Sequence, residues 1–306
     1  MSSALHLAVE RAREGIAPRA RSLIVTVFGD SIVPHGGQLW MGSLIRLMAP
    51  LQVNERLVRT AVQRLTVEDW LQALPDGRRS SYRLTATGQA QVDAVYGRIY
   101  AQRTPEWDGH WRMLLLPQGS LDEAERSALK RELGWLGFGS VSPSLQVHPT
   151  IALPDVKALL DRLGLGDRVA LWQARSSGDG DDRLLRDQVL AGHDMPGVLA
   201  IYQQVLEWFE PIERALRRVK TPDPLLCFCL RTLLIHLYRR ALLRDPQFPD
   251  ALMPPNWPAP AARRLCRDLY RMVSPAANVH LAATIESPPG TVQITEPRHL
   301  DRFGGL

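Results

Sequence analysis

The strongest helical pattern in the chain lies between residues 54 and 69. Its apolar positions recur at helical spacing and are Leu57, Val58, Ala61, Val62 and Leu65. Its polar positions carry long hydrogen-bonding side chains and are Arg56, Arg59, Thr60, Gln63 and Arg64. Residues three and four apart share one face of an α-helix, so the pattern predicts a helix that packs with one face and exposes the other. Asn54 is a favourable N-cap, which directs the first two turns of the polar face outward.

The segments on either side of this helix complete a known motif. Upstream, residues 43–49 are predicted to form a short apolar helix that Pro50 ends, and three residues then lead to Asn54, as in a helix-turn-helix. Downstream, residues 70–74 and 80–84 have strand character and flank Pro75-Asp76-Gly77, in which Asp-Gly is a strong hairpin signal. The order predicts a winged helix, with the second helix in the major groove of DNA and the hairpin near phosphates or the minor groove.

Position along this motif predicts two kinds of DNA contact. Asn54 begins the helix and is included among the expected DNA contacts. The four residues that follow it on the polar face, Arg56, Arg59, Thr60 and Gln63, are expected to read base edges. Phosphates are expected to be held by Arg64, Arg78, Arg79 and Arg83. The alternative is that the polar face is only solvated, as on most surface helices. The flanking helix and the basic hairpin favour DNA binding over that alternative.

The middle of the chain alternates between strand and helix patterns in the order βαββαβ. The strands are predicted at 111–116, 138–141, 144–148 and 168–174, and the helices at 121–136 and 154–163. This order is typical of a ferredoxin-like sheet with helices on one face. Because that fold has many functions, it predicts no activity, and we expect a scaffold or a dimerisation module.

The last part of the chain is predicted to be helical, at residues 182–190, 197–219, 224–244 and 260–273, and to end in a Pro-rich tail. Loop-like composition between residues 103 and 110 and a Gly/Asp-rich run at 176–182, which resembles a linker, separate three blocks. The predicted fold class is therefore α+β. The predicted domains are a winged helix at 18–104, a ferredoxin-like domain at 110–176 and a helical domain at 183–306.

Composition supports a soluble DNA-binding protein. The 306 residues are 45% apolar and 23% charged, which suits a globular protein of two or three domains. The most apolar run, 225–235, contains Arg231, and the N-terminus lacks the pattern of a secretory signal, so we expect no membrane span and a cytoplasmic location. Only three of the 37 basic residues are lysine, and residues 18–90 carry nine arginines against five acidic residues. Arginine binds phosphate and guanine edges in bidentate fashion, which fits a nucleic-acid partner.

The chain also contains partial matches to enzyme motifs. Phe28-Gly29-Asp30-Ser31-Ile32 resembles the nucleophile block of GDSL-type esterases, which need an Asp-x-x-His near the C-terminus as the base. The nearest match is Glu296-x-x-His299, so no catalytic residue is predicted, and Gly29-Asp30 is expected to end the first helix. Cys227, Cys229 and Cys266 lack the further ligands of a metal site, so no metal is predicted and we expect buried, reduced thiols.

Two regions of the chain carry a set of short motifs. In the first block they are Ser22-Leu23-Ile24-Val25-Thr26, Phe28-Gly29-Asp30, Gly37-x-x-Trp40-x-Gly42-Ser43-Leu44-Ile45, Asn54-Glu55-Arg56-Leu57-Val58-Arg59-Thr60 and Arg78-Arg79-Ser80-x-Tyr82-Arg83-Leu84. Near the C-terminus they are Leu230-Arg231-Thr232-Leu233-Leu234-Ile235-His236-x-Tyr238-Arg239-Arg240, Leu243-Arg244-Asp245-Pro246 and Pro254-x-x-Trp257. Together these motifs resemble the PaaX family of transcriptional repressors. The chain differs from that family's pattern at Thr66-Val67-Glu68-Asp69, which is more acidic.

The resemblance implies a homodimeric repressor of a phenylacetate-degradation operon that phenylacetyl-coenzyme A releases from double-stranded operator DNA. It also implies a Cas2-like middle domain and no cofactor. A Cas2-like nuclease is the alternative, but Asp108 precedes the first predicted strand of that domain and no carboxylates cluster with it in the sequence. We therefore expect this domain to be a dimer interface.

An aryl acyl-coenzyme A effector needs cations for its phosphates and an apolar slot for its ring. The candidate contacts are His236, Tyr238, Arg239, Arg240, Arg244 and Trp257. Arg240 and Arg244 are four residues apart and can hold a phosphate from one helix face. The alternative is structural: Arg239, Arg240 and Arg244 pair with Asp245, Asp250 and Asp268 to hold the bundle together, and His236 is a core residue.

Overall fold

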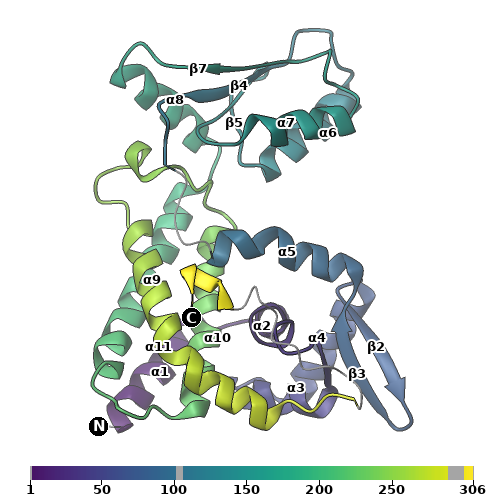
Figure 1. The fold of residues 1–306 in the computed structure, drawn as a ribbon, viewed down its shortest axis with the longest axis vertical. Helices are drawn as coiled ribbons and strands as arrows, with labels where there is room; N and C mark the ends of the chain where they lie inside the picture. Colours follow the sequence, from purple (N-terminus) through teal and green to yellow (C-terminus); the bar gives the residue numbers. More distant parts are fainter. Residues whose placement is uncertain (1, 101–105, 289–299, 306) are drawn as a thin grey trace. The chain divides into compact units, whose positions relative to one another are not determined.

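The computed structural model describes residues 2–100, 106–288 and 300–305, and the chain divides into two compact units (Figure 1). The first unit takes residues 1–102, 201–243 and 258–306, and the second takes residues 103–200 and 244–257. Each unit combines helices with one small antiparallel sheet, which confirms the predicted α+β class. The predicted three-domain division is drawn along the sequence, whereas these units are defined by packing, and that division stays a prediction.

The first unit contains the predicted winged helix. Its elements are α2 (Ala20–Val27), β1 (Gln38–Trp40), α3 (Met41–Met48), α4 (Glu55–Val67), β2 (Leu71–Asp76) and β3 (Arg79–Leu84). The strands form an antiparallel sheet in the order β1-β3-β2. Pro50 lies in the 3-10 turn Ala49–Leu51 after α3, and Gln52 then takes a left-handed conformation that redirects the chain to Asn54.

The hairpin is tighter than the sequence predicts. β2 continues through Pro75 to Asp76, which pairs with Arg79, so only Gly77 and Arg78 form the turn. Pro75 is tolerated because β2 is an edge strand. Gly77 has φ of 56°, which a glycine adopts without strain at the first position of a two-residue hairpin turn.

Long helices surround the winged helix in the first unit. They are α1 (Ser2–Ile16), α5 (Ala86–Tyr100), most of α9 (Met195–Leu216), α10 (Pro224–Leu242) and α11 (Ala259–Thr284). α1 and α5 have no counterpart in the sequence analysis, and α11 continues beyond its predicted end at residue 273. It passes through Pro275 because its packing along α10 outweighs the hydrogen bond that a proline removes.

The first helix of the winged helix does not end at Gly29-Asp30, as the sequence analysis expected. The chain continues from α2 into a π-helical turn, Phe28–Ile32. Such turns are rare and occur where an extra residue in the helix is stabilised by its surroundings. Here the turn directs the side chain of Asp30 into the interior, where it is 2% exposed.

Asp30 is the centre of a buried ion cluster. Its carboxylate is 3.0 Å from Nε of Arg231 and 3.1 Å from Nη1 of Arg302. It also accepts hydrogen bonds from the hydroxyl groups of Tyr100 and Tyr270, at 2.7 and 2.9 Å. Burial by itself raises the pKa of a carboxyl group, but these two guanidinium groups and two hydroxyls hold the pKa of Asp30 below its usual value. The cluster joins the winged helix to α5, α10, α11 and the turn Arg302–Gly304.

The second unit has the predicted ferredoxin-like order. Its elements are β4 (Trp111–Leu115), α6 (Glu123–Trp135), β5 (Gly139–Ser142), β6 (Leu145–His148), α7 (Leu153–Arg162) and β7 (Ala170–Ala174). The sheet order is β5-β6-β4-β7, and all neighbouring strands are antiparallel. Asp122 and Glu125 form a capping box at the start of α6. A leucine-rich core packs α6 and α7 on one face of the sheet.

The other face of this sheet is covered by α8 (Asp179–Ala191) and by residues 244–257. Gly139 allows the close approach of α8, because a Cβ atom there would lie within 2.0 Å of Val189. The indole N–H of Trp111 donates to Asp182 at 2.8 Å. The Gly/Asp-rich run 176–182 is therefore only partly a linker, since a helix begins at residue 179 and packs on the sheet.

The ion cluster predicts a large loss of stability when its one carboxylate is neutralised. In Asp30→Asn two buried guanidinium groups lose their counter-charge, and we expect the free energy of unfolding to fall by roughly 3 to 5 kcal/mol. Urea denaturation followed by circular dichroism measures this change. Asp301→Asn is the control, because that side chain is exposed and its loss is expected to change stability by no more than about 0.5 kcal/mol. Equal stability of Asp30→Asn and wild type would contradict the cluster's role.

Candidate nucleic-acid interface

Helix α4 has the cap and most of the faces that its sequence predicts. The side chain of Asn54 accepts a hydrogen bond from the backbone N–H of Leu57 at 3.0 Å. The inner face is buried and consists of Val58, Ala61, Val62 and Leu65. The outer face is exposed and carries Arg56, Arg59, Thr60, Gln63 and Arg64. Leu57 was wrongly placed on the inner face: it is 48% exposed, because it lies at the margin of that face in the first helical turn.

Local contacts orient two side chains of the outer face. Arg59 forms an ion pair with Glu55 one turn earlier, at 2.8 Å, and both side chains are more than half exposed. The hydroxyl group of Thr60 donates to the carbonyl of Arg56 at 2.9 Å. Exposed ion pairs of this kind contribute little to stability. Arg59 can therefore exchange Glu55 for a group on a binding partner.

The acidic end of α4 has a structural role. Glu68 forms an ion pair with Arg21 of α2. Asp69 accepts a hydrogen bond from the hydroxyl group of Thr87, in α5, at 2.6 Å. The departure from the family pattern at residues 66–69 thus supplies contacts that hold α4 to its neighbouring helices.

The β2–β3 hairpin extends away from the helices of the winged helix and carries three of the predicted basic residues (Figure 1). Arg78 lies in the turn and Arg79 is the first residue of β3, and both are exposed. Arg83 lies further along β3, opposite Gln72 on β2 and Gln38 on β1, and is also exposed. The hairpin is thus a wing with a basic tip.

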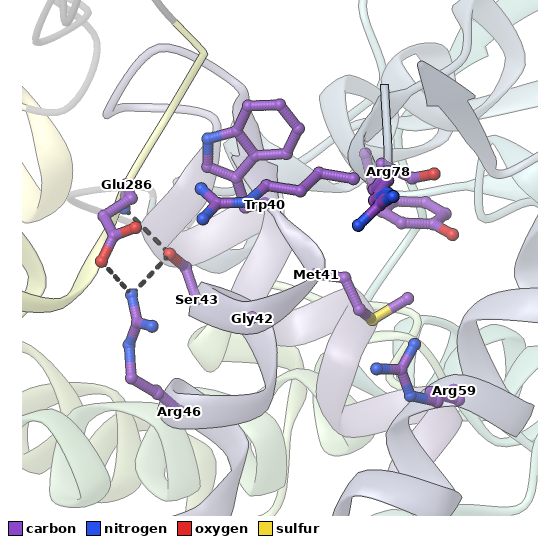
Figure 2. A pocket seen from close by; sticks show the side chains of 11 residues that line it. Trp40, Met41, Gly42, Ser43, Arg46, Arg59, Arg78 and Glu286 are labelled. Atoms are coloured by element: carbon purple, nitrogen blue, oxygen red, sulfur yellow. Dashed lines mark hydrogen bonds and ion pairs between the residues drawn. The ribbon is translucent and has the colours of Figure 1, made fainter. Parts of the chain in front are cut away.

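A pocket of about 400 Å³ lies between the wing, α4 and the start of α3 (Figure 2). It is lined by Trp40, Met41, Gly42, Ser43, Arg46, Arg59, Arg78, Arg79, Ser80, Tyr82 and Glu286. The pocket brings together three predicted DNA contacts, Arg59, Arg78 and Arg79. Arg56, Arg64 and Arg83 do not line it. Four guanidinium groups and one carboxylate give the lining a surplus of positive charge, which favours a polyanion.

Arg46 is the basic residue of this pocket that the sequence analysis missed. It lies on the short apolar helix α3, where a single arginine gives no pattern of its own. The fold brings it to the pocket because the first turn of α3 faces the wing. The backbone N–H groups at the start of a helix attract anions, and α3 begins at Met41 in the lining of the same pocket.

The predicted effector residues are divided between the two units. His236, Tyr238, Arg239 and Arg240 lie on α10 in the first unit, whereas Arg244 and Trp257 lie in the second. Tyr238 is buried, Arg240 is half-buried and Arg244 is exposed. Their assignment to an effector stays a prediction.

Two of these residues pack α10 against α2. Nδ1 of His236 is 3.1 Å from the hydroxyl group of Thr26, and burial lowers the pKa of His236 to about 3, so its ring is neutral at pH 7. Arg239 donates to the hydroxyl and carbonyl groups of Ser22, at 2.9 and 3.2 Å. His236 is thus the core histidine of the structural alternative. Asp268, one of the acidic residues of that alternative, forms an ion pair with its neighbour Arg267.

The esterase-like motif is part of the buried ion cluster. Ser31 is fully buried, donates to Asp30 and accepts from Arg231, so its hydroxyl group is closed to a substrate. Glu296 and His299 lie outside the described residues. Asp108 pairs with Arg112 at 2.7 Å. Within the described part of the chain, no group of three His, Cys, Asp or Glu residues is arranged to hold a metal ion.

The three cysteines are buried and unpaired with one another. Burial raises the pKa of Cys227 to about 11 and that of Cys229 to about 12. Every helix in the described residues is too short or too polar to cross a lipid bilayer.

The chain matches three protein families in succession. They are PaaX-like protein over residues 19–88, the PaaX protein central Cas2-like domain over 104–185 and the PaaX-like protein C-terminal domain over 194–283. It is 35% identical to the transcriptional repressor PaaX of Escherichia coli (strain K12), over 99% of this chain and 96% of that protein. A solved structure of an uncharacterized protein from Mycobacterium tuberculosis is 23% identical, with a TM-score of 0.48, over 78% of this chain and 89% of that one.

The cap of α4 yields a test of the structural role of Asn54. Asn54→Ala removes the acceptor for the Leu57 N–H and is expected to lower the free energy of unfolding by about 1 kcal/mol. Asn54→Ser keeps a capping oxygen and is expected to stay within a few tenths of a kcal/mol of wild type. Chemical denaturation of both variants measures the difference. Equal losses in the two variants would contradict capping by this side chain.

Proposed function

Because this chain belongs to the PaaX-like protein family, we propose that it is a transcriptional repressor, a regulator rather than an enzyme, that binds operator DNA through its winged helix. Families of that name match most of its length, and a repressor is 35% identical over almost the whole chain. The observation that carries the proposal is the exposed polar face of α4, capped and backed by a buried face, beside a wing with basic residues at its tip.

In this proposal α4 enters the major groove. Arg56, Arg59, Thr60 and Gln63 read base edges, and the exposed Leu57 beside them packs on a thymine methyl group. Phosphates are held by Arg64, Arg78, Arg79 and Arg83. The arginine-lined pocket supports joint binding of DNA by α4 and the wing, because residues of both elements line it.

We further propose that the repressor acts as a homodimer. Its two winged helices then meet half-sites about one turn of DNA apart, roughly 34 to 36 Å, or a multiple of that distance. The ferredoxin-like domain is the proposed dimer interface, and the match to a Cas2-like domain supports its role as a module distinct from the winged helix.

The proposed operon is one for the breakdown of an aromatic acid, phenylacetate, and the proposed effector is phenylacetyl-coenzyme A. The half-buried Arg240 on α10 is a candidate phosphate contact, and its neighbour Arg239 is hydrogen-bonded to α2 of the winged helix. A ligand held on α10 therefore acts close to the DNA-binding elements. Release requires that the ligand bind the DNA-incompetent conformation more tightly.

The DNA-binding roles are tested by fluorescence anisotropy with the protein's own promoter and a scrambled duplex of equal length. Arg59→Ala is expected to lower promoter affinity by about 1 to 3 kcal/mol and to reduce the preference for the promoter. Arg79→Ala is expected to weaken binding to both duplexes alike and to flatten the salt dependence. Equal effects of Arg59→Ala on both duplexes would count against base reading, and equal wild-type binding to both would count against a sequence-specific repressor.

The effector role is tested in the same assay with phenylacetyl-coenzyme A and with free phenylacetate. Wild type is expected to leave the promoter only when the thioester is added. Arg240→Ala is expected to keep its promoter affinity and to resist release, because a cation for the ligand's phosphates is lost. Unchanged release of Arg240→Ala would place the ligand elsewhere, and promoter binding that neither compound affects would remove this effector.

A further inference from the structure

The chain that follows α11 is fastened to the winged helix. We name residues 284–288 the strap; in Figure 1 it runs, in yellow, from the end of α11 past α3 towards the hairpin. The backbone N–H of Trp40 donates to the carbonyl of Glu286 at 3.1 Å, and the N–H of Glu286 donates to the hydroxyl of Ser43 at 2.9 Å. The hydroxyl of Ser287 donates to the carbonyl of Gln38 at 2.7 Å. These contacts position the strap along β1 and the first turn of α3.

The strap places a carboxylate at the edge of the arginine-lined pocket. Nη2 of Arg46 is 2.6 Å from Oε1 of Glu286 and also donates to the carbonyl of Thr284 and the hydroxyl of Ser43, at 3.2 and 3.1 Å. Figure 2 shows Glu286, Ser43 and Arg46 together on the left of the pocket and Arg59 on the right. Arg46 is therefore neutralised from within the chain, in a pocket whose other arginines face the proposed DNA surface.

We propose that Arg46 is a ligand of a DNA phosphate and that Glu286 occupies it in the free protein, so that the strap is an internal competitor for DNA. This inference rests on the proposed DNA-binding function and adds the regulation of the same surface. A carboxylate and a phosphodiester both carry one negative charge and both accept hydrogen bonds from a guanidinium group. Arg46 lies in the same pocket as Arg78 and Arg79 of the wing, to which the proposed function assigns phosphate contacts.

The contact is suited to exchange. The side chains of Arg46 and Glu286 are 50% and 63% exposed, and exposed ion pairs contribute little to stability. Each phosphate that an arginine binds also releases counter-ions from the DNA, which favours the complex at low salt. A phosphate can therefore replace Glu286 with little loss of free energy. The backbone hydrogen bonds of the strap meanwhile keep the carboxylate of Glu286 close to Arg46.

Because the strap continues directly from α11, the competitor is tied to the helical bundle of the first unit. α11 packs along α10, and both contribute to the cluster around Asp30. Displacement of α11 would move Glu286 relative to Arg46 and alter the affinity for DNA without touching α4. The strap is thus a physical connection between the bundle and the surface that contacts the phosphates.

The test is a double-mutant cycle on the full chain, read by anisotropy with promoter DNA and a scrambled duplex. Glu286→Gln keeps an acceptor for Arg46 but removes the charge, and it is expected to bind both duplexes about fivefold more tightly at low salt. Arg46→Ala is expected to make the salt dependence shallower by about 0.9 in log–log slope, the value for one lost phosphate contact. In an Arg46→Ala background, Glu286→Gln is expected to change the affinity by less than about twofold, since its effect passes through Arg46.

Glu213→Gln is the control, because it removes the same charge from an ion pair that Glu213, on α9, forms with Arg217 outside the winged helix, and it is expected to bind DNA like wild type. Thermal unfolding shows whether each variant is folded. The inference is overturned if Glu286→Gln binds no more tightly than wild type, or if its gain persists without Arg46, which would indicate a general charge effect. If wild type binds neither duplex, the proposed function is overturned as well; if wild type binds and only the cycle fails, the strap proposal alone falls.

Discussion

The carboxylate of Asp30 is the point on which the first unit depends. It is surrounded by two buried guanidinium groups and two tyrosine hydroxyls that come from four separate segments of the chain. A buried charge without a partner lowers the stability of the fold far more than a surface charge does. Each of these segments therefore stabilises the others by supplying a partner for a buried charge. The winged helix is consequently not an independent module attached by a linker: its first helix, α2, is stabilised by residues more than 200 positions further along the chain.

This arrangement explains what the sequence could and could not predict. Helices α4 and α6 were predictable because periodicity is a local property, and each was found within a few residues of its expected place. Asp30 was misread as the end of a helix because its partners, Arg231 and Arg302, are remote in sequence. The sequence around a π-helical turn does not predict it when the charged groups that stabilise the turn are remote in sequence.

The same distinction applies to the interface. The outer face of α4 and the basic wing could be predicted, since their residues are neighbours in sequence. Arg46 and Glu286 could not, because their meeting depends on a strap that returns from the far end of the chain. The effector residues show the opposite case. The polar side chains clustered on α10 predicted a binding site, but His236 is hydrogen-bonded to Thr26 and Arg239 to Ser22. Sequence spacing showed that these side chains share a region, and only packing shows which of them are already satisfied.

The separation between Asp30 and Arg302 also affects how the protein is made. The two residues are 272 positions apart, so at about 5 to 20 residues per second a ribosome takes roughly 15 to 55 seconds to deliver the second after the first. During that time the nascent winged helix has its carboxylate but not all of its counter-charges. The winged helix is therefore completed late in synthesis, and an incomplete chain carries α4 without the interior that fixes it in place.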